Sequence, residues 1–214
     1  MDMRRRTLIQ LTLLPLLLTP ALARAQFVYQ PTPQDARDLA RIETYLNSIR
    51  TLRAHFMQVA PDGSVSRGTA WLERPGRMRF QYDPPAPFLL VAGHGQLVFQ
   101  DRSINQISQM PLGLTPLGIL LGDHISLTGK VTVVGFQRQT GQLQVTLVRT
   151  NSPQDGSLSL LFSDNPLTLR QWTVLDAQRR VTRVTLYNTE QGIALDPKLF
   201  EFIDPRNFEN QGGG

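Results

Sequence analysis

The chain has 214 residues, of which 22 are Lys or Arg and 17 are Asp or Glu, and its formal net charge is +5 at pH 7. A chain of this length can form one substantial domain with its own hydrophobic core. It contains no cysteine, which excludes disulfides, thiol catalysis and cysteine metal sites.

Residues 1–25 are predicted to be a cleaved signal peptide. The charged run Arg4-Arg5-Arg6 precedes a short, interrupted apolar stretch from Leu8 to Leu18. Ala23-Arg24-Ala25 then forms a small-residue cleavage motif. The apolar stretch is too short for a membrane span, so we expect export of the chain followed by cleavage.

The mature protein is expected to be a single domain over residues 26–214. Its first residue would be Gln26 rather than cysteine, so it would carry no lipid anchor of its own. Cleavage removes four arginines and one aspartate and lowers the formal charge from +5 to +2. Three neighbouring arginines, Arg74, Arg77 and Arg79, make the nearest approach to a basic patch, and surface placement explains them equally well. We expect no nucleic-acid partner.

The segment Pro33–Ser48 is predicted to be an amphipathic helix. Thr32 suits the N-cap, Pro33 the first turn and Asp35 the positive end of the helix dipole. Apolar residues then recur at helical spacing and form one stripe that must pack on another element. These residues are Leu39, Ile42, Leu46 and Ile49.

Almost everything after residue 50 has the pattern of short β-strands divided by turn residues. The regular spacing predicts a large curved antiparallel sheet of about eleven strands, in a mainly β fold with a few helices. The predicted strands are Thr51–Ala60, Val65–Glu73, Arg77–Tyr82, Phe88–Ala92, Gln96–Gln100, Asn105–Gln109, Val131–Gln137, Leu143–Thr150, Ser157–Ser163, Thr168–Leu175 and Val181–Asn188.

One apolar segment interrupts the strands. Thr115 is predicted to cap a short helix over Pro116–Leu121, and Gly122 is predicted to end it. A short apolar helix in the middle of a β-protein either plugs an end of the sheet or forms a mobile flap.

The sequence lacks the motifs of common enzymes. Its three histidines, His55, His94 and His124, have no metal-ligand spacing, and the chain has no HExxH, GxSxG or P-loop motif. We therefore expect neither catalysis nor a metal or cofactor.

Two architectures fit the apolar strand faces, such as Met78, Phe80 and Tyr82. A closed barrel or sandwich would bury them as ordinary core, which is the simpler interpretation. An unclosed barrel would instead expose a concave apolar surface, which the two helices could cover. The space between the helices and the sheet would then suit acyl chains.

The chain resembles the LolA family, periplasmic carriers of lipoproteins in Gram-negative bacteria. Matching pieces occur in the family's order over nearly the whole mature chain. They are Phe56-Met57-Gln58, Gly68-x-x-Trp71-Leu72, Arg74-Pro75-Gly76-Arg77-Met78-Arg79-Phe80-x-Tyr82, Pro84-Pro85, Leu90-Val91-x-x-Gly93-x-Gly95, Gln106-Ile107, Thr115-Pro116-Leu117-x-x-Leu120-Leu121, Leu169-x-x-Trp172-x-Val174-x-Asp176 and Phe200-x-Phe202-x-x-Pro205.

The resemblance implies an unclosed antiparallel β-barrel with a helical lid over an apolar cavity. It implies that Arg74 hydrogen-bonds the lid and keeps it shut, a task that suits five guanidinium donors; an ordinary solvated turn arginine is the alternative. It also places Met78, Phe80 and Leu90 on the cavity side and Leu117, Leu120 and Leu121 in the flap. Methionine at position 78 departs from the often aromatic residue of the family.

The resemblance further implies a monomer that binds acylated lipoproteins. Its partners would be an inner-membrane ABC-type release complex and an outer-membrane lipoprotein acceptor. A lipoprotein-sensing module or a general carrier of lipids or glycolipids would use the same half-barrel.

Overall fold

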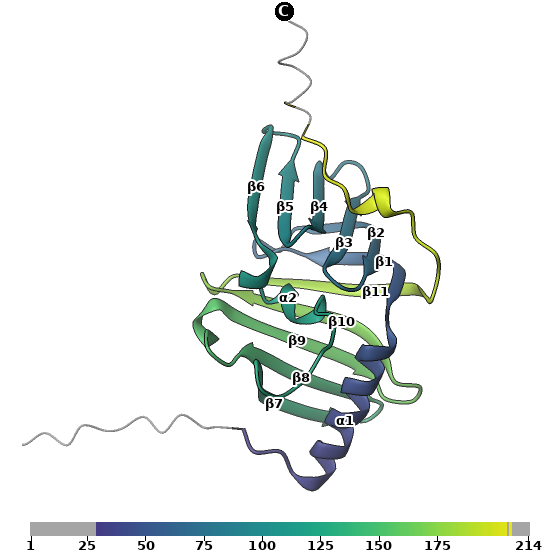
Figure 1. Ribbon diagram of the computed structural model, residues 1–214, viewed down its shortest axis with the longest axis vertical. Helices are drawn as coiled ribbons and strands as arrows, with labels where there is room; N and C mark the ends of the chain where they lie inside the picture. Colours follow the sequence, from purple (N-terminus) through teal and green to yellow (C-terminus); the bar gives the residue numbers. More distant parts are fainter. Residues whose placement is uncertain (1–28, 205, 207–214) are drawn as a thin grey trace, which may run out of the picture.

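The computed structural model describes residues 29–204 and 206, and its elements are labelled in Figure 1. The predicted signal peptide therefore lies outside the described residues. The helices are α1 (Pro33–Ser48), η1 (Leu112–Leu114), α2 (Leu117–Leu120), η2 (Pro153–Asp155) and η3 (Pro197–Phe200). The strands are β1 (Thr51–Val59), β2 (Val65–Glu73), β3 (Arg77–Tyr82), β4 (Phe88–Gly93), β5 (Gln96–Asp101), β6 (Gln106–Pro111), β7 (Val131–Gln139), β8 (Gln142–Arg149), β9 (Gly156–Ser163), β10 (Thr168–Asp176) and β11 (Val181–Gln191).

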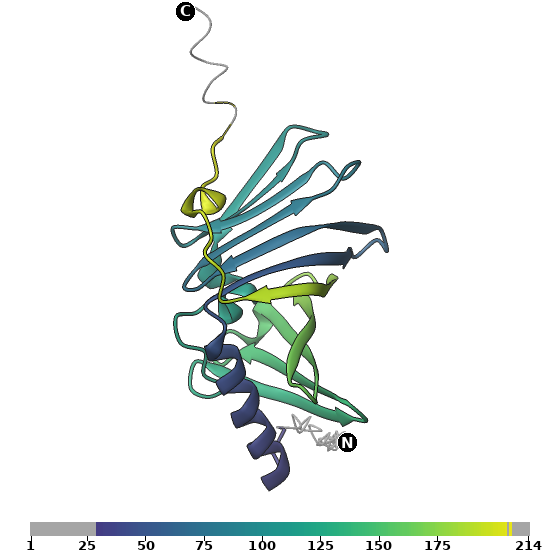
Figure 2. The same cartoon turned by 90° about the vertical axis from the view of Figure 1, so that its right-hand side faces the viewer.

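All eleven strands belong to one antiparallel sheet in the order β6-β5-β4-β3-β2-β1-β11-β10-β9-β8-β7. The two edge strands, β6 and β7, follow each other in the sequence, and the segment between them carries η1 and α2. Figures 1 and 2 show a strongly curved sheet that does not close on itself. The predicted fold, an unclosed antiparallel barrel with an N-terminal helix and a short flap helix, is confirmed.

Period-two alternation gives the strands one continuous buried face. Along β3, the buried Met78, Phe80 and Tyr82 alternate with more exposed neighbours, as predicted. Because the strands pair in register, the same face continues through β8, β9 and β10. Its fully buried members there include Leu143, Val145, Leu147, Leu158, Leu160 and Phe162.

Helix α1 begins as predicted and packs its apolar stripe on this face. Thr32 and Asp35 form a reciprocal capping box, with Asp35 N donating to Thr32 Oγ1 at 3.2 Å. Ile42 and Leu46 are almost completely buried. Tyr45 packs edge-to-face on Phe162 of β9, with ring centroids 6.0 Å apart. The helix thus covers the β7–β10 half of the sheet (Figure 1).

Helix α2 is shorter than predicted, and its predicted cap is wrong. The N-cap residue is Pro116, which offers no side-chain hydrogen bond, and the helix runs only over Leu117–Leu120. Thr115 Oγ1 donates instead to the carbonyl of Leu112 at 2.9 Å. This hydroxyl closes the preceding 3-10 turn, because a serine or threonine side chain can bond a carbonyl three residues earlier.

Two glycines serve the hairpin that carries β2 and β3. Gly76 adopts φ +75° in the turn, a conformation that favours glycine. Gly68 permits a close approach between strands, because a Cβ there would lie 2.1 Å from the carbonyl oxygen of Gln81.

An ion-pair network fixes the first half of α1 to the sheet. Asp38 is 3% exposed and accepts hydrogen bonds from Arg138 of β7, with Nε at 3.0 Å, and from Arg41 Nη1 at 2.9 Å. Arg41 also pairs with Asp164 in the β9–β10 turn at 3.1 Å. Although burial opposes ionisation, the donors Arg138, Arg41 and Gln34 hold the pKa of Asp38 below its ordinary value.

We expect Asp38→Asn to destabilise the protein by at least about 1 kcal/mol at neutral pH, because it removes hydrogen bonds to a charged acceptor. A carboxylate with a lowered pKa in the folded state stabilises above its unfolded pKa of about 4, and this stabilisation is lost as the pH falls. The difference in unfolding free energy between wild type and variant should therefore shrink below pH 4. Urea denaturation at several pH values measures it.

The exposed Asp83 gives a matched control. Asp83→Asn should change the unfolding free energy little at any pH between 3 and 7. An Asp38→Asn effect that stays constant across this range would show that the charge of Asp38 contributes nothing to the anchor.

Candidate functional site

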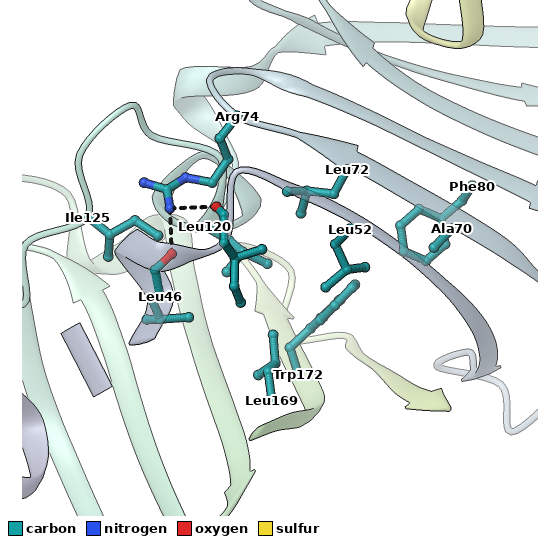
Figure 3. Close-up of a pocket in the computed structure, with 11 residues that line it drawn as sticks. Leu46, Leu52, Ala70, Leu72, Arg74, Phe80, Leu120, Ile125, Leu169 and Trp172 are labelled. Carbon is teal, nitrogen blue, oxygen red and sulfur yellow. Dashed lines mark hydrogen bonds between the residues drawn. The ribbon is translucent and has the colours of Figure 1, made fainter. Parts of the chain in front are cut away.

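The side chain of Arg74 connects the β2–β3 turn to both helices. It is 6% exposed, so the alternative of a solvated turn arginine is wrong. Each of its three nitrogens donates to α1 or to the segment after α2. Figure 3 shows the bond to the carbonyl of Leu46. The acceptors are the carbonyls of Leu46 (2.5 Å), Ile49 (3.2 Å), Gly122 (2.8 Å) and Asp123 (2.9 Å) and the amide oxygen of Asn47 (3.3 Å).

The electrostatics of this contact depend on dipoles rather than on a buried carboxylate. Burial lowers the pKa of Arg74, and the nearby charge of Arg50 lowers it further, while Asp123 opposes them. Two of the acceptors are carbonyls at the C-terminal end of α1, where the helix dipole is negative. The guanidinium thereby supplies hydrogen-bond donors that these carbonyls lack within the helix.

Further hydrogen bonds join α1 directly to the segment that follows α2. Asn47 Nδ2 donates to the carbonyl of Ile125 at 2.7 Å, and Ile125 N donates back to Asn47 Oδ1 at 3.0 Å. Leu127 N donates to Glu43 Oε2 at 2.8 Å. The two helices and residues 121–127 therefore form one connected cover, which we call the lid.

A small apolar cavity of about 20 Å³ lies between the lid and the sheet, beside Arg74. This volume is close to the minimum needed for one water molecule, so the space beneath the lid is almost filled by side chains. Figure 3 shows these residues. They are Leu46, Ile49, Leu52, Ala70, Leu72, Arg74, Phe80, Leu120, Ile125, Leu169 and Trp172.

A larger cleft of about 370 Å³ is lined by Leu117, the first residue of α2. Its size lies within the range of small-molecule sites. We call it the mouth cleft. Its lining is mostly apolar and consists of Gln58, Pro61, Met78, Phe80, Tyr82, Leu90, Phe99, Leu117, Trp172, Val174, Asp176, Arg180, Thr182 and Val184. Burial raises the pKa of Tyr82 to about 12, and its protonated hydroxyl donates to Gln58 Oε1 at 2.8 Å.

The residues expected from the sequence fall into three places. Met78, Leu90 and Leu117 line the mouth cleft, Leu120 lines the small cavity, and Phe80 lines both. Leu121 is buried in the core at 2% exposure, and its carbonyl accepts from Gly76 N at 2.8 Å. The functional roles of these residues remain predictions.

Several residues of the site were not expected from the sequence. Glu43 and Asn47 lie one turn apart on α1 and both bind the lid segment, so their i, i+4 spacing is the signal that could have found them. Trp172 belongs to one of the family motifs, but its place in both cavities depends on how the curved sheet brings its ring to Phe80 of β3, with three strands between β10 and β3 in the sheet order. No sequence signal connects Asp38 with Arg138, which lie 100 residues apart.

The described residues also limit other kinds of site. Among residues 29–204 and 206, no group of three or more His, Asp or Glu side chains could hold a metal ion. No helix in this part of the chain is long and apolar enough to cross a membrane.

We expect Arg74→Lys to loosen the lid without unfolding the sheet. An ammonium offers three donors from one atom and cannot reach acceptors both on α1 and on the segment after α2, so several buried carbonyls lose their partners. Hydrogen bonds to charged groups contribute about 1.5–3 kcal/mol each, and exchange of the Ile125 and Leu127 amides should therefore accelerate at least about tenfold. Hydrogen exchange read by NMR measures it.

Arg77→Lys is the matched control, because Arg77 occupies the same turn and pairs only with Glu73, at 3.3 Å, among the described carboxylates. It should leave the exchange of Ile125 and Leu127 unchanged. Equal protection of these amides in Arg74→Lys and wild type would contradict a latch at Arg74.

The family profile described as "Outer membrane lipoprotein carrier protein LolA" matches residues 47–203. An outer-membrane lipoprotein carrier protein from Methylococcus capsulatus is 31% identical over 185 residues, which cover 82% of this chain and 86% of the relative. A protein of the same name from Nitrosomonas europaea is 27% identical over 189 residues, covering 84% and 91% of the two chains.

Among solved structures, a LolA superfamily protein from Nitrosomonas europaea matches with a TM-score of 0.42 and 12% identity, over 77% of this chain and 97% of the other. This likeness is too weak to add to the sequence matches. The family profile covers most of the chain, and one relative exceeds 30% identity over most of its own length. The chain belongs to the LolA family of outer-membrane lipoprotein carrier proteins.

Proposed function

We propose that this protein is a periplasmic carrier that binds the acyl chains of lipoproteins released from the inner membrane and delivers them to the outer membrane. The observation that carries the proposal is a lid over an apolar concave sheet, fastened by one buried arginine. Its relatives bear the name of outer-membrane lipoprotein carriers. The predicted signal peptide fits a function outside the cytoplasm.

The physical task of such a carrier is to keep acyl chains out of water. At about 0.8 kcal/mol per methylene, three long chains cost on the order of 35 kcal/mol when exposed. A soluble protein can shield them only with a large apolar surface of its own. The concave face supplies this surface, and the lid covers it when no cargo is bound.

Loading then exchanges one set of apolar contacts for another. In the empty state, Leu120 and Ile125 occupy the concavity, and the remaining space is only about 20 Å³. The acyl chains would displace these side chains, which requires Arg74 to release its acceptors. Reclosure of the lid restores these hydrogen bonds and so favours release of the cargo. The protein itself performs no covalent chemistry in this cycle.

The residues take the following roles in the proposal. Arg74 is the latch that stabilises the closed state. Apolar side chains of the sheet and of the flap contact the cargo or replace it in the closed state. They are Met78, Phe80, Leu90, Leu117, Leu120 and Leu121.

The direction of transfer requires partners. An ATP-driven inner-membrane release complex of the ABC type would supply the lipoprotein, and an outer-membrane acceptor would remove it. A monomer is sufficient for this function, because the lid and the concave face belong to the same chain.

We expect Arg74→Leu to bind a triacylated lipoprotein but to transfer it poorly. The variant loses the hydrogen bonds that favour the closed state, so closure no longer helps to expel the cargo. Transfer to acceptor-containing liposomes should fall at least about tenfold while loading persists. Both steps can be followed with a purified lipoprotein loaded by the release complex.

Arg77→Leu serves as control and should transfer at the wild-type rate. Normal transfer by Arg74→Leu would refute the latch role. Native mass spectrometry of the protein purified from the periplasm of its host tests the cargo itself. An adduct with the mass of a phospholipid or glycolipid, in place of a lipoprotein, would refute the proposed cargo.

A further inference from the structure

The apolar space beside α2 is divided into two compartments by two aromatic rings. Within the part of the chain that the structure describes, only Phe80 and Trp172 line both the small cavity and the mouth cleft. Their rings meet edge-to-face, with centroids 5.8 Å apart and an interplanar angle of 71°. Both side chains are nearly buried, at 2% and 4% exposure. They stand between a space of about 20 Å³ and one of about 370 Å³.

The latch belongs to the small compartment alone. Leu46 and Ile49, whose carbonyls accept from Arg74, line the small cavity. None of the five residues that accept from Arg74 lines the mouth cleft. A ligand can therefore enter the cleft without breaking any hydrogen bond of Arg74.

Helix α2 presents a different leucine to each compartment. Leu117 lines the mouth cleft, and Leu120 lines the small cavity. The acceptors Gly122 and Asp123 lie beyond the C-terminal end of the helix. A ligand in the cleft thus contacts Leu117, the first residue of α2. Arg74 meanwhile holds the segment that follows Leu120, the last residue of this helix.

The lining of the mouth cleft suits a single chain with a polar end. The rings of Phe80, Tyr82 and Phe99 form the aromatic wall of the cleft. They are connected through Phe56 and Phe88, which lie outside the lining, with ring centroids 4.6 Å apart for Phe80 and Phe56, 5.1 Å for Phe56 and Tyr82, and 5.6 Å for both Tyr82–Phe88 and Phe88–Phe99. The cleft also has polar lining residues, which come from β1 and from the β10–β11 hairpin. They are Gln58, Asp176, Arg180 and Thr182.

The side chain of Arg180 is 64% exposed and is held by Asp176 at 2.8 Å. It can therefore offer donors to a polar head while the chain lies on the aromatic wall. The cleft volume, about 370 Å³, lies near the lower end of the range for small-molecule sites. It has room for one chain and not for three.

We propose that the mouth cleft is a separate binding site for one acyl chain, which we call the seat. An acyl chain binds in the seat while Arg74 still holds the lid closed. Phe80 and Trp172 form the partition that separates the seat from the small cavity. This inference rests on the proposed carrier function and adds a first binding step to it. The first chain of a lipoprotein docks in the open cleft. The remaining chains enter only when Phe80 and Trp172 move apart and Arg74 then releases its acceptors.

The test uses the intrinsic fluorescence of Trp172, one of the two partition residues. The chain contains two tryptophans, and Trp71 lies in β2 opposite Arg79, whose side chain is on the other face of the sheet from Phe80. In a Trp71→Phe background, the emission of Trp172 reports on the cleft. The probes are lysophosphatidylcholine below its micelle concentration, which has one chain, and a synthetic triacylated lipopeptide.

The single-chain probe should change Trp172 emission saturably and leave the slow exchange of the Ile125 and Leu127 amides intact. The triacylated probe should accelerate this exchange at least tenfold. If the single-chain probe also removes the protection, or if it fails to bind while the triacylated probe binds, the separate seat is refuted and the carrier function stands. If neither probe binds, the proposed function itself fails.

Substitutions locate the seat. Thr182→Phe fills the cleft from β11 and should weaken single-chain binding at least tenfold. Thr173→Phe is the matched control, because Thr173 lies between Trp172 and Val174 on β10 and therefore faces away from the cleft. Leu90→Phe narrows the cleft from β4 and provides a second variant if Thr182→Phe fails to fold. Unchanged single-chain binding by a folded cleft variant would place the probe elsewhere and overturn the proposal.

Discussion

The closed state depends on one guanidinium group and the carbonyl oxygens that surround it. Arg74 lies in the β2–β3 turn, and its side-chain nitrogens donate to the end of α1 and to the segment after α2. A buried charge is costly to desolvate, so its contribution depends on satisfied hydrogen bonds. The lid is therefore held by directional bonds that are formed or lost together, rather than by apolar contact alone.

The magnitudes explain how such a lid could be both shut and displaceable. Each bond from a charged donor contributes about 1.5–3 kcal/mol. Burial of one chain with roughly fifteen methylenes contributes about 12 kcal/mol. One acyl chain can thus offset much of the latch, and three exceed it. The small cavity of about 20 Å³ shows that the lid side chains already fill the space that cargo would take, so closure exchanges contacts and leaves little void.

The topology of the sheet determines where the lid closes and where cargo can displace it. Its two edge strands are joined only through the segment that carries α2, so the barrel opening is bridged by the flap instead of by strand pairing. Helix α1 is held separately by Asp38, Arg41 and Arg138 on the far half of the sheet. The lid consequently has one end anchored by ion pairs and another fastened by Arg74, and the mouth cleft meets the lid at Leu117 of α2.

The sequence by itself determined the strands, the exact span of α1 and the burial of Met78, Phe80 and Tyr82, because period-two and helical patterns are local. It also indicated Arg74 and the flap through an ordered set of family motifs. The local patterns left open whether the sheet closes and whether Arg74 is buried, and the family resemblance predicted an unclosed sheet with Arg74 bonded to the lid. The tertiary structure decided between the alternatives, since both depend on how distant strands and loops meet. The pairing of Asp38 with Arg138 and the division of the apolar space by Phe80 and Trp172 were likewise decided there, because no local pattern encodes contacts across roughly a hundred residues.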